Sequence, residues 1–98
     1  MTASVSYFAI GHIGNILIDS PPVNAISQHV RQGILDALQT AASDDTQIVV
    51  LRCEGRTFIA GADIREFGKS PQAPALAIVL EALESHTKPI IAAIHGTA

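Results

Sequence analysis

Gln47-Ile48-Val49-Val50-Leu51-Arg52-Cys53 is the stretch that decides the fold of this chain. Its continuous apolar run from Ile48 to Leu51 is typical of a strand that is covered on both faces, as in the middle of a parallel sheet. A second apolar run, Lys88-Pro89-Ile90-Ile91-Ala92-Ala93-Ile94, predicts another buried strand. Since the chain between the two runs is long enough for a crossover helix, we expect the two strands to be parallel and joined by a right-handed connection.

Two further strands are predicted before the apolar run from Ile48 to Leu51. The segments from Val5 to Ile10 and from Asn15 to Asp19 are rich in strand-forming residues, and Gly11-His12-Ile13-Gly14 lies between them as a glycine-bracketed turn. This pattern indicates a β-hairpin. Pro21-Pro22 then prevents a strand or a helix from continuing. The expected order of elements is β-β-α-β-α-β, and the expected fold class is α/β.

The first helix is predicted from about Gln28 to Ala42, with Ser27 as its N-cap. Asp44-Asp45 then breaks the helical pattern. The residues that we expect to face the core share helical spacing. They are Val30, Ile34, Leu35, Leu38 and Ala41.

A second helix is predicted to begin at Ser70-Pro71, with the serine as N-cap and the proline at the first helical position. We expect it to run to about His86, and we expect a short helical turn from Asp63 to Phe67. The residues that we expect on the buried face of the second helix again share helical spacing. They are Leu76, Val79, Leu80 and Leu83.

Composition excludes several classes of protein. Among the 98 residues, 48% are hydrophobic, which favours a packed core over disorder. With 6 Lys and Arg against 9 Asp and Glu, the chain lacks the basic surface that nucleic acid requires. The single cysteine, Cys53, has no partner for a disulfide within the chain, and we expect it to be buried and inert in a reducing compartment.

The N-terminus shows no targeting pattern, and the chain shows no membrane-spanning pattern. The N-terminal residues Met1 to Ser4 do not begin a signal peptide, and no window holds enough apolar residues for a membrane span. We therefore predict a cytoplasmic protein without a membrane partner. Because a core strand is followed at once by the end at Ala98, we expect the 98 residues to be the N-terminal portion of a single, larger domain.

The loop Ala60-Gly61-Ala62-Asp63 is where we expect chemistry, because it follows a buried strand in an α/β pattern. Its small side chains let a ligand approach the main chain, and the backbone N–H of Ala62 can then point at an oxygen that becomes negative in a transition state. Asp63 is better placed to cap the following turn than to act as a base. The alternative is that Gly61 only makes a tight turn and the alanines only pack.

Four segments taken together resemble the crotonase superfamily, which comprises the enoyl-CoA hydratases and isomerases. They are Pro21-Pro22-Val23-Asn24-Ala25-Ile26-Ser27, Ile48-Val49-Val50-Leu51-Arg52, Phe58-Ile59-Ala60-Gly61-Ala62-Asp63-Ile64-Arg65-Glu66-Phe67 and Lys88-Pro89-Ile90-Ile91-Ala92-Ala93-Ile94-His95-Gly96. The resemblance covers nearly the whole chain. The first segment is similar to the hydratase part of multifunctional fatty-acid oxidation enzymes.

The resemblance implies a spiral of ββα units and a site made largely of backbone. It implies that the Ala62 N–H donates one of two hydrogen bonds to the thioester oxygen, while the second donor, a glycine, and the catalytic carboxylates lie beyond Ala98. The 98 residues alone are then expected to be inactive. Coenzyme A is part of the substrate, with no covalently bound cofactor and no metal. NAD is expected only if a dehydrogenase part follows, and the whole protein is expected to be a homotrimer, a hexamer, or a monomer if multifunctional.

The same resemblance assigns the binding of the substrate to the backbone and side chains around Ala62. In the family this loop holds the adenine end of coenzyme A, and a basic residue after it can reach the phosphates. The positions implied here are Ala60, Gly61, Asp63, Ile64 and Arg65.

The histidines offer weaker candidates. We expect His12, His29 and His86 to be solvated or to cap helices, and His95 to line the site without acting in catalysis. The reaction stays open among hydration in fatty-acid β-oxidation, with or without isomerisation of the double bond, and another acyl-CoA reaction such as hydrolysis. A non-catalytic acyl-CoA-binding module is the alternative from a different class.

Overall fold

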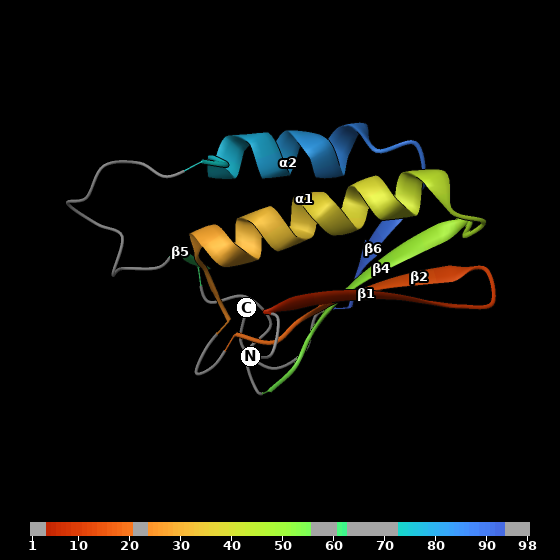
Figure 1. Ribbon diagram of the computed structural model, residues 1–98, viewed down its shortest axis with the longest axis horizontal. Helices are drawn as coiled ribbons and strands as arrows, with labels where there is room; N and C mark the ends of the chain where they lie inside the picture. The colour runs from red at the N-terminus through yellow and green to blue at the C-terminus, as the bar shows by residue number, and fades with distance from the viewer. Residues whose placement is uncertain (1–3, 21–23, 56–60, 63–72, 94–98) are drawn as a thin grey trace.

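A four-stranded mixed sheet forms around β4 (Ile48–Cys53), the continuous apolar run in the middle of the sequence (Figure 1). The computed structural model describes residues 4–20, 24–55, 61–62 and 73–93. The strand order is β1-β2-β4-β6, where β1 is Val5–Ile10, β2 is Ile13–Ile18 and β6 is Ile90–Ala92. β1 and β2 are antiparallel, whereas β2, β4 and β6 are mutually parallel, so the predicted α/β class and parallel crossovers are confirmed.

Both helices lie on one side of this sheet (Figure 1). α1 (Gln28–Ser43) packs against β1 and β2, and α2 (Leu76–Ser85) packs on α1. The buried apolar side chains form one cluster between the sheet and the helices. They are Ile16, Ile18, Val30, Ile34, Ala37, Leu38, Ala41, Val49, Leu51, Cys53 and Val79.

The central strand alternates in burial, contrary to the expectation that it is covered on both faces. Val49, Leu51 and Cys53 are buried, whereas Ile48 and Val50 are half-buried and Arg52 is exposed. Successive side chains of a strand point to opposite faces. Helices cover one face of β4, and the side chains of β4 on the other face are less buried among the described residues.

The hairpin between β1 and β2 is tighter than predicted. Its turn consists of Gly11 and His12 alone, and Ile10 pairs with Ile13, so Ile13 and Gly14 belong to β2 and the predicted start at Asn15 was wrong. Gly11 has φ of +59°, a left-handed conformation that two-residue hairpin turns require.

Gly14 serves packing rather than the turn. A Cβ atom at this position would lie 2.3 Å from the Tyr7 hydroxyl oxygen. Gly33 has the same role inside α1, where an added Cβ would lie 2.6 Å from the Cβ of Val5. The two glycines therefore let β1 lie close to its neighbouring strand and helix.

α1 confirms most of its prediction. It begins at Gln28, the Ser27 hydroxyl accepts a hydrogen bond from the Val30 N–H at 3.3 Å, and the helix ends at Asp44 as C-cap. Arg31 was not expected in the core, yet only 8% of it is exposed.

α2 differs from its prediction in both start and face. Residues 73–75 are described and precede the helix, so the predicted start at Pro71 was wrong; Ser70, Pro71 and the predicted turn from Asp63 to Phe67 lie outside the described residues. Val79 is buried and Leu83 half-buried, as predicted, but Leu76 and Leu80 are 37% and 51% exposed. α2 contacts α1 along one narrow stripe, which leaves its other apolar residues uncovered by the described part of the chain.

β6 is more exposed than its apolar sequence predicts. It is the last strand of the sheet, and Ile91 is 52% exposed. Within the described ranges no helix is both long and apolar enough to cross a membrane.

Candidate functional site

The predicted reactive loop contains a short strand that the sequence did not predict. β5 (Gly61–Ala62) pairs in parallel with β3 (Ala25–Ile26), with Ala25 opposite Gly61 and Ile26 opposite Ala62. This two-stranded sheet lies beside the beginning of α1 (Figure 1). The main chain at Ala62 is therefore held by a partner strand from the segment before α1.

Asn24 fixes the entry to β3. It is 3% exposed and has φ of +54°, a left-handed conformation that asparagine tolerates better than most residues. Its Oδ1 accepts a hydrogen bond from the Ser20 N–H at 2.8 Å, and its Nδ2 donates to the Glu54 carbonyl at 2.7 Å. Since Ser20 follows β2 and Glu54 follows β4, Asn24 ties together the carboxyl ends of two parallel strands, the edge at which α/β folds bind ligands.

Arg31 connects β3 to the chain that leads into α2. Its Nη1 donates to the Ile26 carbonyl at 3.1 Å, and its Nε donates to the Pro74 carbonyl at 2.6 Å. Gln28, one turn earlier in α1, donates from Nε2 to the Ala73 carbonyl at 3.0 Å. Side chains from the first turns of α1 thus bind the main chain of both β3 and the segment that precedes α2.

The structure describes two of the predicted site residues, Gly61 and Ala62. The predicted binding residues Ala60, Asp63, Ile64 and Arg65 lie outside the described residues, as does His95. Asn24 and Arg31 hold main-chain groups of these segments through side-chain hydrogen bonds, and sequence reasoning singled out neither residue. Asn24 belongs to the Pro-Pro-Val-Asn-Ala motif, and its place after Pro21-Pro22 was the one signal that pointed to it.

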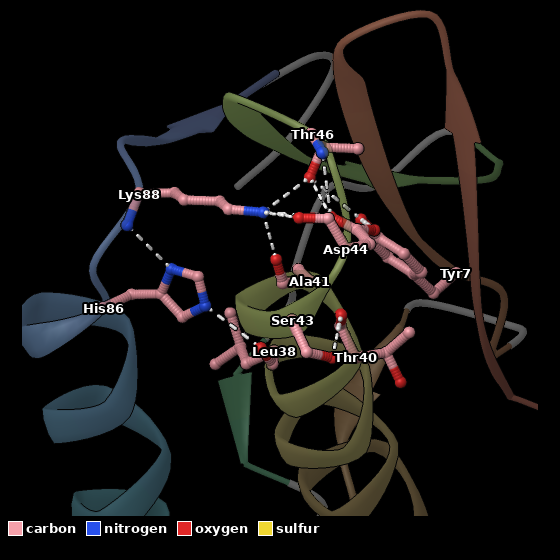
Figure 2. Close-up of polar contacts among 9 residues, drawn as sticks. All are labelled: Tyr7, Leu38, Thr40, Ala41, Ser43, Asp44, Thr46, His86 and Lys88. Carbon is pink, nitrogen blue, oxygen red and sulfur yellow. Dashed lines mark hydrogen bonds and ion pairs between the residues drawn. The ribbon is translucent and has the colours of Figure 1, made fainter.

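A second polar cluster lies at the far end of α1 and joins residues from four parts of the chain (Figure 2). The Lys88 ammonium donates to the Ala41 carbonyl, to the Asp44 carbonyl at 3.0 Å and to Asp44 Oδ1 at 2.9 Å. The Tyr7 hydroxyl donates to Asp44 Oδ2 at 2.5 Å, and Thr46 donates to Oδ1 from both its N–H and its hydroxyl. A cation at this position stabilises the carbonyls that end a helix.

His86 adds to the same end of the helices. Its Nε2 lies 3.0 Å from the Leu38 carbonyl oxygen, and its Nδ1 accepts from the Lys88 N–H. His86 is the C-cap of α2, which agrees with its expected capping role, whereas His12 and His29 are exposed.

The hydrogen bonds in this cluster favour a charged Asp44 side chain and a neutral Tyr7 hydroxyl. The hydrogen bonds from Thr46 and then Tyr7 hold the pKa of Asp44 well below its usual range, while burial and then the Asp44 bond raise the pKa of Tyr7. The cluster precedes β4 and β6, at the edge of the sheet opposite the carboxyl ends. We therefore interpret it as a structural anchor rather than a site.

Cys53 behaves as the sequence predicted. It is 7% exposed, and burial raises the pKa of its thiol to about 11. A thiol that stays protonated is a poor nucleophile. In the part of the chain that the structure describes, no three acidic, cysteine or histidine residues gather as a metal site would require.

Comparison with known proteins agrees with this geometry. Residues 10–98 match the family described as Enoyl-CoA hydratase/isomerase. The chain is 43% identical over 84 residues to a peroxisomal bifunctional enzyme of Danio rerio, covering 85% of this chain and 12% of that protein. It is 37% identical over 91 residues to a probable enoyl-CoA hydratase of Bacillus subtilis, covering 85% and 35%.

A relative named for a different reaction is equally similar. The (7aS)-7a-methyl-1,5-dioxo-2,3,5,6,7,7a-hexahydro-1H-indene-carboxyl-CoA hydrolase of Mycobacterium tuberculosis is 37% identical over 89 residues, covering 83% of this chain and 36% of that enzyme. Identity to named relatives thus shows the family without separating hydration from hydrolysis.

The fold matches solved structures of the same kind. A putative enoyl-CoA hydratase/isomerase from Acinetobacter baumannii superposes with a TM-score of 0.82 at 28% identity, covering 98% of this chain and 42% of that chain. The 98 residues thus span between about a tenth and two fifths of the proteins they match. The chain belongs to the enoyl-CoA hydratase/isomerase family, a group within the crotonase superfamily.

Proposed function

We propose that the protein containing this chain is an enoyl-CoA hydratase whose Ala62 N–H is one of two hydrogen-bond donors to the thioester oxygen of the substrate. The observation that carries the proposal is the pairing of β5 with β3, since it holds the main chain at Ala62 on a partner strand at the sheet edge expected for ligands. A fixed donor stabilises developing charge without reorganising during the reaction.

The proposal places a requirement on the β3–β5 ladder. In parallel strands, successive residues direct their N–H groups to opposite sides. If the Ala62 N–H points to substrate, Gly61 must be the residue whose main chain bonds β3. The absence of a side chain on Gly61 would then let the thioester reach its neighbour.

The remaining parts of the mechanism are also proposals. Ala60, Gly61, Asp63, Ile64 and Arg65 would hold the coenzyme A portion of the substrate, and a glycine and carboxylates outside the 98 residues would complete the oxyanion site and move protons. The 98 residues would then be the N-terminal portion of one domain, and they would be inactive alone. Turnover of a 2-enoyl-CoA by the purified 98-residue chain would contradict that part of the proposal.

Ala62→Pro in the whole natural protein tests the central claim, because proline has no N–H to donate. We expect kcat for a 2-enoyl-CoA to fall about 100- to 1,000-fold, the usual effect of losing one such donor. Ala62→Gly keeps the N–H and should lose far less. Circular dichroism and thermal melting show whether each variant is folded, and a folded Ala62→Pro variant with normal turnover would rule the assignment out.

Hydrolysis of the thioester is a second candidate, favoured by the 37% identity to the hydrolase of Mycobacterium tuberculosis. The same oxyanion site would serve either reaction, because both add charge to the thioester oxygen. Incubation with a 2-enoyl-CoA separates them. Hydration removes the conjugated absorbance without releasing thiol, hydrolysis releases free coenzyme A, and binding without either change would support a non-catalytic module.

Wider properties of the protein follow from the proposed family reaction. Besides hydration, we propose isomerisation of the double bond and a place in fatty-acid β-oxidation. We also propose that the whole protein is a homotrimer or hexamer, or a monomer if it is multifunctional. NAD would be used only by an attached dehydrogenase part. A cytoplasmic location remains our prediction, and the peroxisomal name of the Danio rerio relative supplies the alternative compartment to test by microscopy.

A further inference from the structure

Arg31 is a buried cation that the proposed reaction does not yet use. It is 8% exposed, and its guanidinium donates to two backbone carbonyls, those of Ile26 and Pro74. Removing a guanidinium from water is costly unless its donors are satisfied. A simple apolar residue would fill this position of the helix at less cost, so the position of Arg31 calls for an explanation.

The two carbonyls belong to two separate segments of the chain, one of which pairs with the proposed site. Ile26 lies opposite Ala62 in the β3–β5 ladder. Pro74 lies just before α2, where the chain returns to α1 after β5. One side chain on α1 therefore holds both the strand that pairs with the proposed donor and the segment that leads into α2.

We infer that Arg31 is a positioning residue for the oxyanion site: it sets the place of the Ala62 N–H through the Ile26 carbonyl and β3. This inference rests on the proposed function. Misplacing a reacting group by about 1 Å can cost about 100-fold in rate, so a small shift of β3 is enough to matter.

The planar fork of arginine suits this task better than lysine does. A guanidinium presents donors in fixed directions, and here Nε and Nη1 reach two carbonyls at 2.6 and 3.1 Å. An ammonium group carries its three donors on one nitrogen at the end of a flexible stem, so it cannot reach these two carbonyls from two separate nitrogens in a fixed plane. Arg31→Lys therefore keeps the charge and much of the volume while it loosens β3.

The test uses the whole natural protein, a 2-enoyl-CoA substrate, a saturated acyl-CoA and a 2,4-dienoyl-CoA as probe. Hydrogen bonds to the thioester oxygen polarise the conjugated chain and move its absorption to longer wavelength when it binds. This shift is measured for each bound molecule, so it does not depend on the fraction of protein that is folded. A purely structural role of Arg31 would leave it unchanged.

For Arg31→Lys we expect kcat to fall about 10- to 100-fold and the red shift of the bound dienoyl-CoA to shrink by about half or more. The Kd of the saturated acyl-CoA should change by less than about threefold, because the donor contacts only its thioester oxygen while the coenzyme A portion makes the other contacts. Arg31→Gln, which is neutral and shorter, should reduce the red shift at least as much. Arg52→Lys is the matched control, since Arg52 is exposed and should keep the wild-type kcat and red shift.

The outcomes separate the inference from the function on which it rests. If the wild-type protein binds the dienoyl-CoA without any red shift and turns over no thioester, the proposed oxyanion function fails, and the role of Arg31 fails with it. If the wild type shows both and the folded Arg31→Lys and Arg31→Gln variants keep the full red shift, Arg31 does not position the donor while the proposed function stands. A fall in kcat that matches only the loss of folded protein would likewise exclude Arg31 as a positioning residue.

Discussion

At the scale of single residues, Asp44 is the most heavily bonded carboxylate among the described residues. It accepts hydrogen bonds from Tyr7, Thr46 and Lys88. These bonds favour its charged form, so the pKa of Asp44 is lower in the folded protein than its ordinary value of 3.8. Protons then bind the unfolded chain more tightly, and the stability that Asp44 contributes is present above about pH 4 and is lost as the pH falls below it.

Asp44→Asn should therefore lower the thermal midpoint of the protein at pH 7 and do so less at pH 3, so that the two melting curves converge in acid. Thermal unfolding between pH 3 and 7 checks this. Asp45→Asn, at the exposed neighbouring position, controls for the loss of one negative charge. A difference between wild type and Asp44→Asn that stays constant from pH 7 to pH 3 would contradict the linkage. The raised pKa of Tyr7 acts in the opposite sense, with its contribution lost only above about pH 10.

Sequence reasoning identified the local roles of residues better than their distant partners. The burial of Cys53 followed from its place in an apolar run, and Asp44-Asp45 was correctly predicted to end a helix. The bonds of Asp44 reach residues 37 and 44 positions away, however, and those of Arg31 reach a residue 43 positions away. No periodic pattern encodes such pairs, because they depend on which elements the fold brings together.

At the scale of elements, the beginning of α1 depends on Ser27. Its hydroxyl satisfies the Val30 N–H, one of the groups that a helix start leaves without an internal partner. Ser27→Ala should lower the free energy of unfolding by about 1 kcal/mol, whereas Ser27→Asp should nearly preserve it. Urea unfolding of the three proteins measures this. Equal stability of the alanine and serine forms would show that the cap contributes nothing.

A matched substitution at the other end of the same helix sharpens this measurement. Ser43 is exposed, and its hydroxyl donates to the Thr40 carbonyl within the last turn. Ser43→Ala removes the same atom from a position that does not cap the helix start, and we expect its effect to stay within about 0.5 kcal/mol.

The helices and strands were predictable to different degrees for physical reasons. α1 has one apolar stripe and polar residues elsewhere, so its helical period was clear. α2 carries apolar residues on several faces, and the sequence could not show that Val79 rather than Leu80 faces α1. β3 and β5 have two residues each, which is too short for any alternating pattern to appear.

At the scale of the whole molecule, the described residues include several exposed apolar side chains on one face of the sheet. Phe8, Ile10 and Ile13 lie on this face of the hairpin, and Ile91 lies on it at β6; all four are at least 40% exposed. An apolar face beside an unpaired edge strand favours association between molecules. We therefore expect the purified 98-residue chain to self-associate as its concentration rises.

Substituting lysine for both Ile10 and Ile91 should shift this association to higher protein concentration, because each charge would have to be buried. Sedimentation velocity over a range of concentrations measures the effect. Leu80→Lys, on the exposed side of α2, is the control for added positive charge. If the chain sediments as a monomer at every concentration, these exposed apolar residues do not mediate self-association.

The contacts of Lys88 also bear on the order in which the chain acquires its structure during synthesis. Its ammonium reaches Ala41, Asp44 and Thr46, which are made 42 to 47 residues earlier. On the ribosome, α1 and the β1–β2 hairpin can emerge well before this cation exists. The Ala41 and Asp44 carbonyls therefore lack this donor until residue 88 leaves the exit tunnel, and β6 can pair with β4 only after that. The contacts between Lys88 and the end of α1 can thus form only late in translation, although α1 itself is made early.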